Sequence, residues 1–514
     1  MKKNTRIALA AALAVLAFGY SKFRAKPSAS EGKQGTSGQY RIASNVESFR
    51  FGSFDFSACE LEREHSAATT KAWCAPFQVP ENRADANGRK LDLKFALIAS
   101  TQAADDDFIV YLAGGPGQSA VDTWPQMANA LGPARKHRHV LLLDQRGTGA
   151  SNPLKCKEEQ GEDEDALPLD LERTAASTQR CLDEVSKFAD PRFYTTSEAV
   201  EDLEALRQAL GGPKFDLVGV SYGTRVAQQY LKRHPEGVRS IVLDSVAPNE
   251  LALGGEFSGN LDDALKAQFA YCAKTPVCAK TFPDPYGDLF RLRAILAATP
   301  REIRYADPVT FKQTKQTLNA ESMVGLVRMF AYAPETAALV PHTIKQSIAG
   351  NDAPLLGQIG MLSQGIEALV GSGMQLSVIC AEDADRLSPD PTDADTLLGT
   401  RLLEVLQRQC RIWPRGTRPA DFSEAVTGAT PILVLEGELD PVTPPRYGEQ
   451  VVKHLSNARL IVARGQGHNI IGRGCLPKLV GTFMDTLDPK ALDAGCVDEL
   501  GPLPHFIDFN GAAP

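Results

Sequence analysis

Short apolar runs alternate with helix-like stretches over most of this chain. Runs at residues 108–112, 140–143, 215–220 and 240–244 are compact and apolar, as in buried strands. Residues 195–210 begin with a threonine and have a glutamate three positions later, a capping pattern that predicts a helix. Residues 224–233 predict another helix. Strands that alternate with helices in this way predict a mostly parallel sheet with helices on both faces.

The pattern changes between about residues 250 and 425, where mainly helical stretches replace the apolar runs. Strand-like runs return at residues 432–435 and 460–463. We therefore predict one α/β core, residues 46–250 and 426–514, interrupted by a helical cap at residues 251–425. Such a cap would roof the carboxyl ends of the strands, where ligands of these folds bind.

The first 20 residues have the pattern of an export signal, with Lys2, Lys3 and Arg6 before an apolar run at 7–18. Spanning a bilayer takes about 20 apolar residues, so this run is short for a membrane helix. An uncleaved anchor is the alternative. Residues 21–45 predict a flexible leader. We expect a periplasmic or secreted protein, with no stable membrane partner once the signal is removed.

Composition and cysteine content agree with an exported globular protein. The 514 residues are 43% hydrophobic and 23% charged, and their net charge of −8 disfavours nucleic acid as a partner. Ten cysteines suggest disulfides. No cysteine or histidine spacing is typical of zinc, so we predict neither a metal nor a cofactor. The predicted pairs join successive cysteines: Cys59–Cys74, Cys156–Cys181, Cys272–Cys278, Cys380–Cys410 and Cys475–Cys496.

A G-x-S-x-G motif at residues 219–223 lies between a predicted strand and a predicted helix. A chain that turns sharply there needs small residues two positions either side of the serine, and the turn exposes the hydroxyl. The motif alone also occurs in plain turns, but this setting predicts that Ser221 is a nucleophile.

A serine nucleophile needs a base and an orienting acid, which follow an elbow of this kind in the order acid, then histidine. Of eight histidines, only His468 follows a predicted strand in a glycine-rich loop, GQGH at 465–468. Three carboxylates compete as the acid after the strand at 432–435. Glu436 closes the strand and Glu438 fits a solvated loop, so we favour Asp440, which lies in the turn beyond.

Two backbone amides are needed to hold the oxyanion of an acyl-transfer intermediate. One is the amide of Tyr222, directly after the nucleophile. The other should come from the GGPG sequence at 114–117, directly after a strand, where glycines allow close approach. We predict that Gly115 supplies it.

These motifs resemble the α/β-hydrolase serine peptidases that include proline iminopeptidases and secreted tripeptidyl aminopeptidases. The similarity covers GGPG at 114–117, DQRGTGAS at 144–151, GVSYGT at 219–224, DPVTP at 440–444 and the Gly-His pair at 467–468. The resemblance implies an α/β-hydrolase fold and cleavage of peptide substrates at a free N-terminus. An enzyme of that kind must recognise an ammonium group, and Glu382 and Asp383 in the predicted cap are candidates. Surface charge or helix capping is the alternative for both.

We expect an exported serine hydrolase, an aminopeptidase acting through an acyl-enzyme. An esterase or lipase-like enzyme of the same fold is one alternative, because a triad does not distinguish esters from amides. A non-catalytic binding protein on this scaffold is the other.

Overall fold

A computed structural model describes residues 42, 46–62, 69–104, 107–156, 171–306, 311–366 and 372–512. These residues belong to one compact unit, residues 38–514. The predicted signal peptide at 1–20 lies outside the described residues, and so does the predicted leader at 21–45 apart from Ile42. Within the described ranges, no helix combines the length and the apolar character needed to cross a bilayer.

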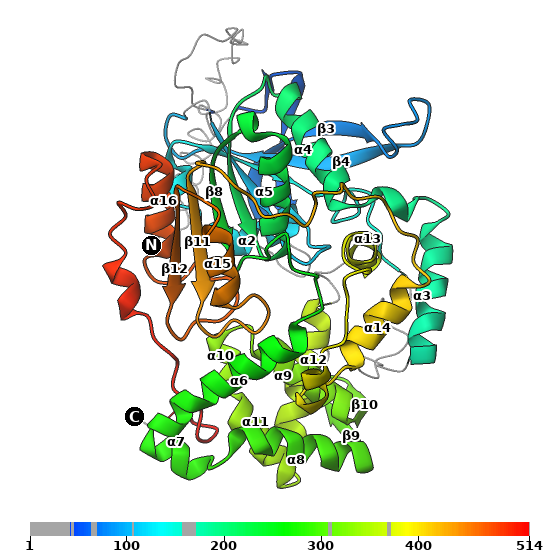
Figure 1. Ribbon diagram of the computed structural model, residues 1–514, viewed down its shortest axis with the longest axis vertical. Helices are drawn as coiled ribbons and strands as arrows, with labels where there is room; N and C mark the ends of the chain where they lie inside the picture. The colour runs from blue at the N-terminus through cyan, green and yellow to red at the C-terminus, as the bar shows by residue number, and fades with distance from the viewer. Residues whose placement is uncertain are drawn as a thin grey trace, which may run out of the picture. The chain divides into compact units, whose positions relative to one another are not determined.

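A ten-stranded sheet organises the chain, in the order β1-β2-β3-β4-β6-β5-β7-β8-β11-β12 (Figure 1). Neighbouring strands are parallel from β6 to β12, and the other edge is antiparallel. The strands are β1 (Ser48–Phe51), β2 (Phe54–Glu62), β3 (Thr69–Pro80), β4 (Lys90–Ile98), β5 (Phe108–Leu112), β6 (His139–Leu143), β7 (Phe215–Val220), β8 (Val238–Asp244), β11 (Ile432–Gly437) and β12 (Ala458–Ala463).

The degree of burial of each strand explains which strands could be predicted from the sequence. Every residue of β6, β7 and β11 is buried, and all but one position in each strand is occupied by an apolar residue or glycine, the exceptions being His139, Asp216 and Glu436. In β3, exposed and buried positions alternate along much of the strand, and its sequence carries lysine and proline. The antiparallel strands β1 to β3 were not predicted, because their weaker apolar pattern resembles that of a loop.

Helices cover both faces of the sheet, and two hydrophobic clusters fill the spaces between sheet and helices. Thr195 caps α4 as predicted, with its side chain accepting a bond from the amide of Glu198. The helices of the core are α2 (Ala120–Met127), α3 (Leu171–Val185), α4 (Thr196–Ala209), α5 (Tyr222–Arg233), α15 (Pro445–Val452) and α16 (Leu476–Thr486).

The segment between β8 and β11 adds no strand to the large sheet. Figure 1 shows α6, α8, α9 and α11 gathered beyond one end of that sheet. A further difference from the expected helical pattern is a two-stranded hairpin of β9 (Arg301–Ala306) and β10 (Gln313–Leu318). The helices are α6 (Phe257–Lys274), α7 (Pro276–Thr281), α8 (Pro285–Ala298), α9 (Ala320–Phe330), α10 (Pro334–Ala337), α11 (Val340–Ile348), α12 (Ala353–Ile366), α13 (Ser372–Glu382) and α14 (Arg401–Cys410).

This segment divides into two parts by packing. Residues of α6, α8, α9, α11 and α12 form a hydrophobic cluster of their own. Residues of α13 and α14 instead belong to the main cluster beneath the sheet. The boundaries predicted for the core and the cap stay a prediction, because α13 and α14 pack with the core although they lie within the predicted cap.

All five predicted cysteine pairs are disulfides in the structure. Their sequence separations run from 6 to 30 residues, so each bond closes a short loop. Cys380–Cys410 joins the end of α13 to the end of α14 and fixes this pair of helices covalently.

Candidate active site

Ser221 lies at a sharp turn between β7 and α5. Its φ of 54° and ψ of −122° place a non-glycine residue in a strained backbone region. The flanking glycines make this turn possible: a Cβ on Gly219 would lie 2.5 Å from the carbonyl oxygen of Gly223. A Cβ on Gly223 would lie 2.1 Å from the carbonyl oxygen of Leu112. The turn therefore has the shape of the predicted nucleophile elbow.

The imidazole of His468 is bonded to the carboxylate of Asp440, with 2.7 Å between Nδ1 and Oδ2. Asp440 is buried, and its Oδ1 accepts bonds of 2.8 Å from the amides of Val442 and Thr443. The Thr443 hydroxyl donates to Oδ2 at 3.0 Å. An ionised Asp440 makes Nδ1 the donor, which leaves Nε2 of the neutral ring free to accept a proton.

Glu436 and Glu438, the two other carboxylates considered for this role, are bonded elsewhere. Glu436 is completely buried, and its Oε1 accepts from the amide of Val246 at 3.0 Å while its Oε2 has no partner in the described part of the chain. Burial and the nearby Asp440 raise the pKa of Glu436 well above its ordinary value, which favours its protonated form. Glu438 accepts from the amide of Gly465 at 2.7 Å. Of these three carboxylates, Asp440 is the one bonded to the imidazole.

Asp244, a residue that the sequence analysis missed, connects the loops of Ser221 and His468. Its backbone oxygen accepts from the amide of Ser221 at 2.9 Å. Its carboxylate accepts from the amides of Ile470 and Ile471 at 2.9 and 3.1 Å. The side chain is completely buried, and burial raises its pKa to about 6. An acidic residue that directly ends an apolar strand was the signal that could have revealed it.

These contacts bring the loops of the nucleophile and the base to the same end of the sheet. The Ser221 hydroxyl has no hydrogen bond to the imidazole among the residues that the structure describes. In enzymes without substrate such bonds are often long, and they shorten when the substrate binds.

The loop after β5 lies against the nucleophile. A Cβ on Gly114 would lie 3.2 Å from the Cβ of Ser221. Gly115 has a φ of +107°, in the region that favours glycine. Tyr222 opens α5 on the other side of the serine, so its amide lies at the positive end of the helix dipole. Gly115 therefore lies in the loop that borders Ser221, and Tyr222 directly follows Ser221 at the start of α5.

Glu382 lies beside the side chain of Tyr222. Its carboxylate accepts bonds from the amide of Thr196 at 2.6 Å and from the Thr196 hydroxyl at 2.9 Å. That hydroxyl is 2.7 Å from the hydroxyl of Tyr222. Glu382 is completely buried, and burial together with Asp383 raises its pKa to about 8. Glu382 is therefore largely protonated at neutral pH and is bonded within the protein.

Asp383 is also completely buried. Its Oδ2 lies 2.8 Å from the guanidinium of Arg225, whose side chain is itself inaccessible. Arg386 bonds the other oxygen, and the amide of Leu253 adds a bond of 3.2 Å. The predicted role of Glu382 and Asp383 in binding an ammonium group stays a prediction, since both carboxylates have partners within the protein.

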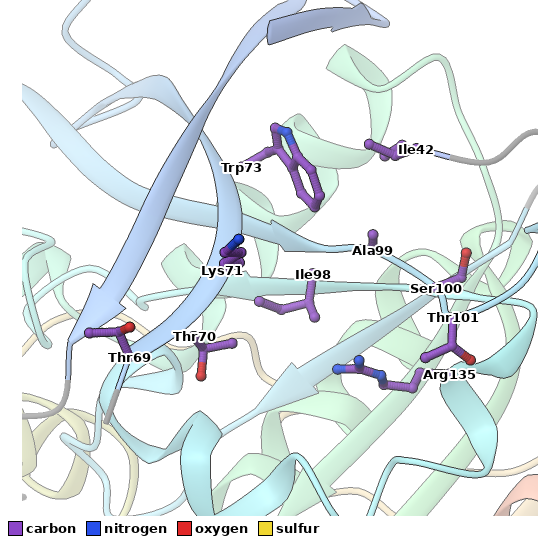
Figure 2. A pocket seen from close by; sticks show the side chains of 10 residues that line it. All are labelled: Ile42, Thr69, Thr70, Lys71, Trp73, Ile98, Ala99, Ser100, Thr101 and Arg135. Carbon is purple, nitrogen blue, oxygen red and sulfur yellow. The ribbon is translucent and has the colours of Figure 1, made fainter. Parts of the chain in front are cut away.

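A cavity of about 470 Å³ lies elsewhere, over β3 and β4. Figure 2 shows its lining side chains, among them Trp73 and the basic residues Lys71 and Arg135. None of its lining residues comes from the loops that carry Ser221, Asp440 or His468. It is therefore separate from the candidate active site.

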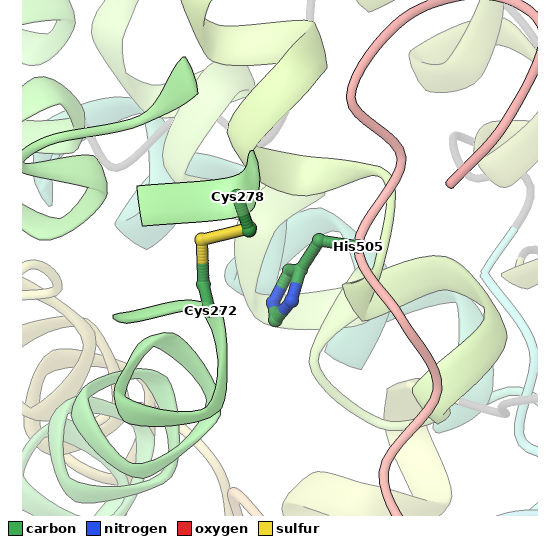
Figure 3. Close-up of side chains that lie close together, drawn as sticks. All are labelled: Cys272, Cys278 and His505. Carbon is green, nitrogen blue, oxygen red and sulfur yellow. A yellow bond between two sulfur atoms is a disulfide. The ribbon is translucent and has the colours of Figure 1, made fainter. Parts of the chain in front are cut away.

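Two groups of metal-type ligands occur in the described ranges. Cys272, Cys278 and His505 bring ligand atoms within 4.8 Å of one another, as Figure 3 shows, but the two sulfurs are bonded together. A disulfide sulfur is not the thiolate that a metal requires. In the second group, of Glu204, His234 and Glu236, the carboxylate of Glu204 bonds Arg207 at 2.8 Å. Neither group lies at the candidate active site.

Residues 107–473 match the family model of the alpha/beta hydrolase fold. The chain belongs to this family. The match contains the elbow, Asp440 and His468, which confirms the fold class and the resemblance inferred from the motifs.

Three relatives illustrate the range of proteins that the chain resembles. It is 24% identical to serine protease Hip1 of Mycobacterium tuberculosis over 415 residues, which cover 73% of this chain and 78% of the relative. It is 23% identical to a tripeptidyl aminopeptidase of Streptomyces lividans over 478 residues, 84% of each chain. It is 27% identical to carboxylesterase B of Mycobacterium tuberculosis over 482 residues, 84% of this chain and 88% of the relative. The protein is a hydrolase with serine-protease relatives.

Proposed function

We propose that this protein is a serine aminopeptidase that releases residues or short peptides from free peptide N-termini. Ser221 is the nucleophile, His468 the general base, and Asp440 the acid that orients it. The observation that carries the proposal is the 2.7 Å bond between Asp440 and His468, next to a glycine-flanked elbow. Relatives named as a serine protease and as tripeptidyl aminopeptidases support peptides as the substrate class.

The reaction follows from the position of each group. Nε2 of His468 removes the proton of Ser221, and the serine oxygen attacks the scissile carbonyl. The amides of Gly115 and Tyr222 stabilise the oxyanion, and Asp440 stabilises the imidazolium. His468 then protonates the departing amine, and the acyl-enzyme is hydrolysed by water along the same route.

Recognition of the free N-terminus is a separate part of the proposal. Glu382 is the better of the two acidic candidates, because Thr196 connects it to Tyr222 at the oxyanion site. Both oxygens of Asp383 are bonded to arginines. Binding at Glu382 requires a substrate ammonium to replace bonds from Thr196 and to stabilise the ionised carboxylate.

The test combines active-site labelling with a comparison of substrates. A fluorophosphonate should label the wild-type protein and Ser186→Ala, which alters an exposed serine, but not Ser221→Ala. Peptides with a free N-terminus should be cleaved at least ten times faster than their N-acetylated forms. An unlabelled wild type would contradict the nucleophile. Equal cleavage of free and acetylated peptides would contradict the aminopeptidase assignment.

A carboxylic ester hydrolase is the second candidate, favoured by the 27% identity to carboxylesterase B. It has the same triad and the same acyl-enzyme. Turnover of simple esters without any cleavage of peptide amides, by a protein that the fluorophosphonate labels, would favour this candidate over the first.

We further propose that the protein is exported. Five disulfides support this, because such bonds persist in oxidising compartments and are rare in the cytosol. Fractionation of the producing cells, followed by assay of each fraction, tests it.

A further inference from the structure

The end of α9 lies directly against the proposed general base. The amide of His468 donates to the carbonyl oxygen of Tyr332 at 2.7 Å. The Tyr332 ring meets the imidazole edge to face, with ring centres 5.2 Å apart and planes at 75°. A Cβ on Gly467 would lie 2.3 Å from the Tyr332 carbonyl oxygen, so the two backbones are in close contact. Tyr332 thus connects the helical segment to the side of the site that His468 occupies.

Arg328 lies on α9, one turn before Tyr332 in the chain. Its guanidinium is 6.0 Å from the centre of the Tyr332 ring and 5.2 Å from that of Phe257, the first residue of α6. Its side chain is half-buried. Among the described residues it forms neither a hydrogen bond nor an ion pair. Two aromatic rings therefore hold a cation whose five N–H donors are unused.

Other arginines around this site differ from Arg328. Arg225 pairs with Asp383 at 2.8 Å, Arg446 bonds Glu256 at 3.2 Å, and Arg473 pairs with Glu335. In each of these three cases an ion pair with a carboxylate accounts for the position of the guanidinium. In the described part of the chain Arg328 has ring contacts only, so its planar donor group is available to bind an anion from outside the protein.

The position of the leaving group identifies that ligand. Under the proposed function, His468 protonates the departing amine, so the departing peptide begins beside the imidazole. Tyr332 borders the imidazole, and the guanidinium of Arg328, on α9, lies 6.0 Å from the centre of the Tyr332 ring. A guanidinium on this side is suited to a carboxylate carried by the departing peptide, which it can bind through two parallel bonds.

We propose that Arg328 is a specificity-determining residue that binds a carboxylate on the leaving side of the substrate. This inference rests on the proposed peptidase function. The substrates it favours are short peptides in which the C-terminal carboxylate, or an acidic side chain, follows closely after the scissile bond.

The experiment compares alanine peptides of two to five residues, each as free acid and as C-terminal amide. For at least one length, wild-type kcat/KM should be about tenfold or more higher for the acid, the usual scale of a charge-assisted bond. Arg328→Gln should abolish that preference and leave the amide unchanged within about twofold. Arg328→Lys should restore part of it, because a lysine keeps the charge but not the planar fork.

Two controls separate binding from a structural effect. Arg291→Gln removes the same charge from α8, where Arg291 pairs with Asp288 at the surface, and should keep the full preference. Alanyl p-nitroanilides have no carboxylate, so Arg328→Gln should hydrolyse them at the wild-type rate. Peptide amides with aspartate or asparagine after the scissile bond distinguish a side-chain carboxylate from a terminal one.

The inference is overturned if the wild type prefers the acid at no length, or if Arg328→Gln slows acids, amides and anilides equally. Absence of all peptide cleavage, with Ser221 still labelled by the fluorophosphonate, would contradict the proposed function instead. In that case, the role of Arg328 is tested by measuring how well peptides protect Ser221 from labelling by the fluorophosphonate. Free-acid peptides should protect the wild type more than amides do, and equal protection would refute the carboxylate site.

Discussion

Two helices near the site differ in the charged residues that they carry: α13 ends in acids that are paired within the protein, and α9 carries an arginine without an anionic partner in the described residues. On α13 and directly after it, Glu382 and Asp383 are inaccessible and every carboxylate oxygen has a partner. On α9, Arg328 is half-buried and has only aromatic neighbours in the described ranges. The α13 acids draw attention in the sequence, as a pair next to a cysteine. Arg328 does not stand out there at all.

The comparison shows that charge alone does not identify a ligand-binding residue. A buried carboxylate that is already bonded stabilises the fold, and a ligand must displace its partners to reach it. A cation with unused donors incurs no such cost. We therefore expect changes at Asp383 to alter mainly stability. Changes at Glu382 should alter stability and, under the proposed function, recognition of a free N-terminus, whereas changes at His468, Asp440 or Arg328 should alter mainly the reaction.

The largest effect on the reaction is expected at Asp440, the acid that orients the proposed general base. Asp440→Asn should lower kcat by about 10⁴-fold, because an amide favours the wrong tautomer of His468 and does not stabilise its charge. Steady-state hydrolysis of an alanyl p-nitroanilide measures this. A loss below tenfold would mean that the imidazole depends on another group, and Asp244→Asn would then be the next variant to measure.

Asp383→Ala should give the largest loss of stability on the α13 side. It leaves the inaccessible Arg225 without its carboxylate, which typically costs about 3–5 kcal/mol. Urea unfolding measures the free energy. The matched control is Asp385→Ala, which removes an exposed partner of Arg418 and should cost at most about 1 kcal/mol. Equal losses in the two variants would contradict a structural role specific to Asp383.

Glu382→Gln should change how stability depends on pH. With its pKa at about 8, Glu382 stays protonated in the folded protein while an unfolded chain has already lost that proton. Folding therefore takes up a proton between the ordinary glutamate pKa and pH 8, and stability falls as pH rises through this window. The wild type should lose up to about 1.4 kcal/mol per pH unit relative to Glu382→Gln.

The difference between the two unfolding free energies should become independent of pH below the ordinary glutamate pKa, change through the window up to about pH 8, and level off above it. Parallel profiles for wild type and variant would mean that Glu382 is ionised in the folded protein at neutral pH. The carboxylate would then be ready to bind an ammonium group without first losing a proton.

The smallest effect on stability is expected from Arg328→Gln. The variant loses only contacts between a half-buried guanidinium and two rings, worth about 1 kcal/mol. Urea unfolding should show this small change, whereas the substrate preference of the same variant should be lost. A destabilisation of 3 kcal/mol or more would place Arg328 in the same structural class as Asp383.

The elbow and the disulfides could be predicted because local pattern determines both. Gly219 and Gly223 are needed wherever a strand turns into a helix this sharply, and the flanking runs identify that strand and helix. Short separations led to all five disulfide pairs. The strands β1 to β3 and the hairpin of β9 and β10 were missed, since alternating or polar strands carry a weak signal.

Contacts between distant segments could not be predicted. Asp244 reaches the amides of Ile470 and Ile471, more than 200 positions later in the chain, and Tyr332 reaches His468 from α9. Helices α13 and α14 pack with the core although their helical pattern placed them in the cap. Periodicity gives the type of each element but not the surface against which it packs.

By itself, the sequence determined the positions of the parallel strands along the chain, the elbow, and the residue types available for the proposed triad. It could do so because backbone strain and apolar periodicity act over a few residues. Tertiary structure alone decided which charges are satisfied: Asp383 by an arginine on α5, Glu382 by a threonine on α4, and Arg328 by no anion in the described part of the chain. Solvation and pairing of a charge depend on everything folded around it, and that environment comes from segments far apart in the sequence.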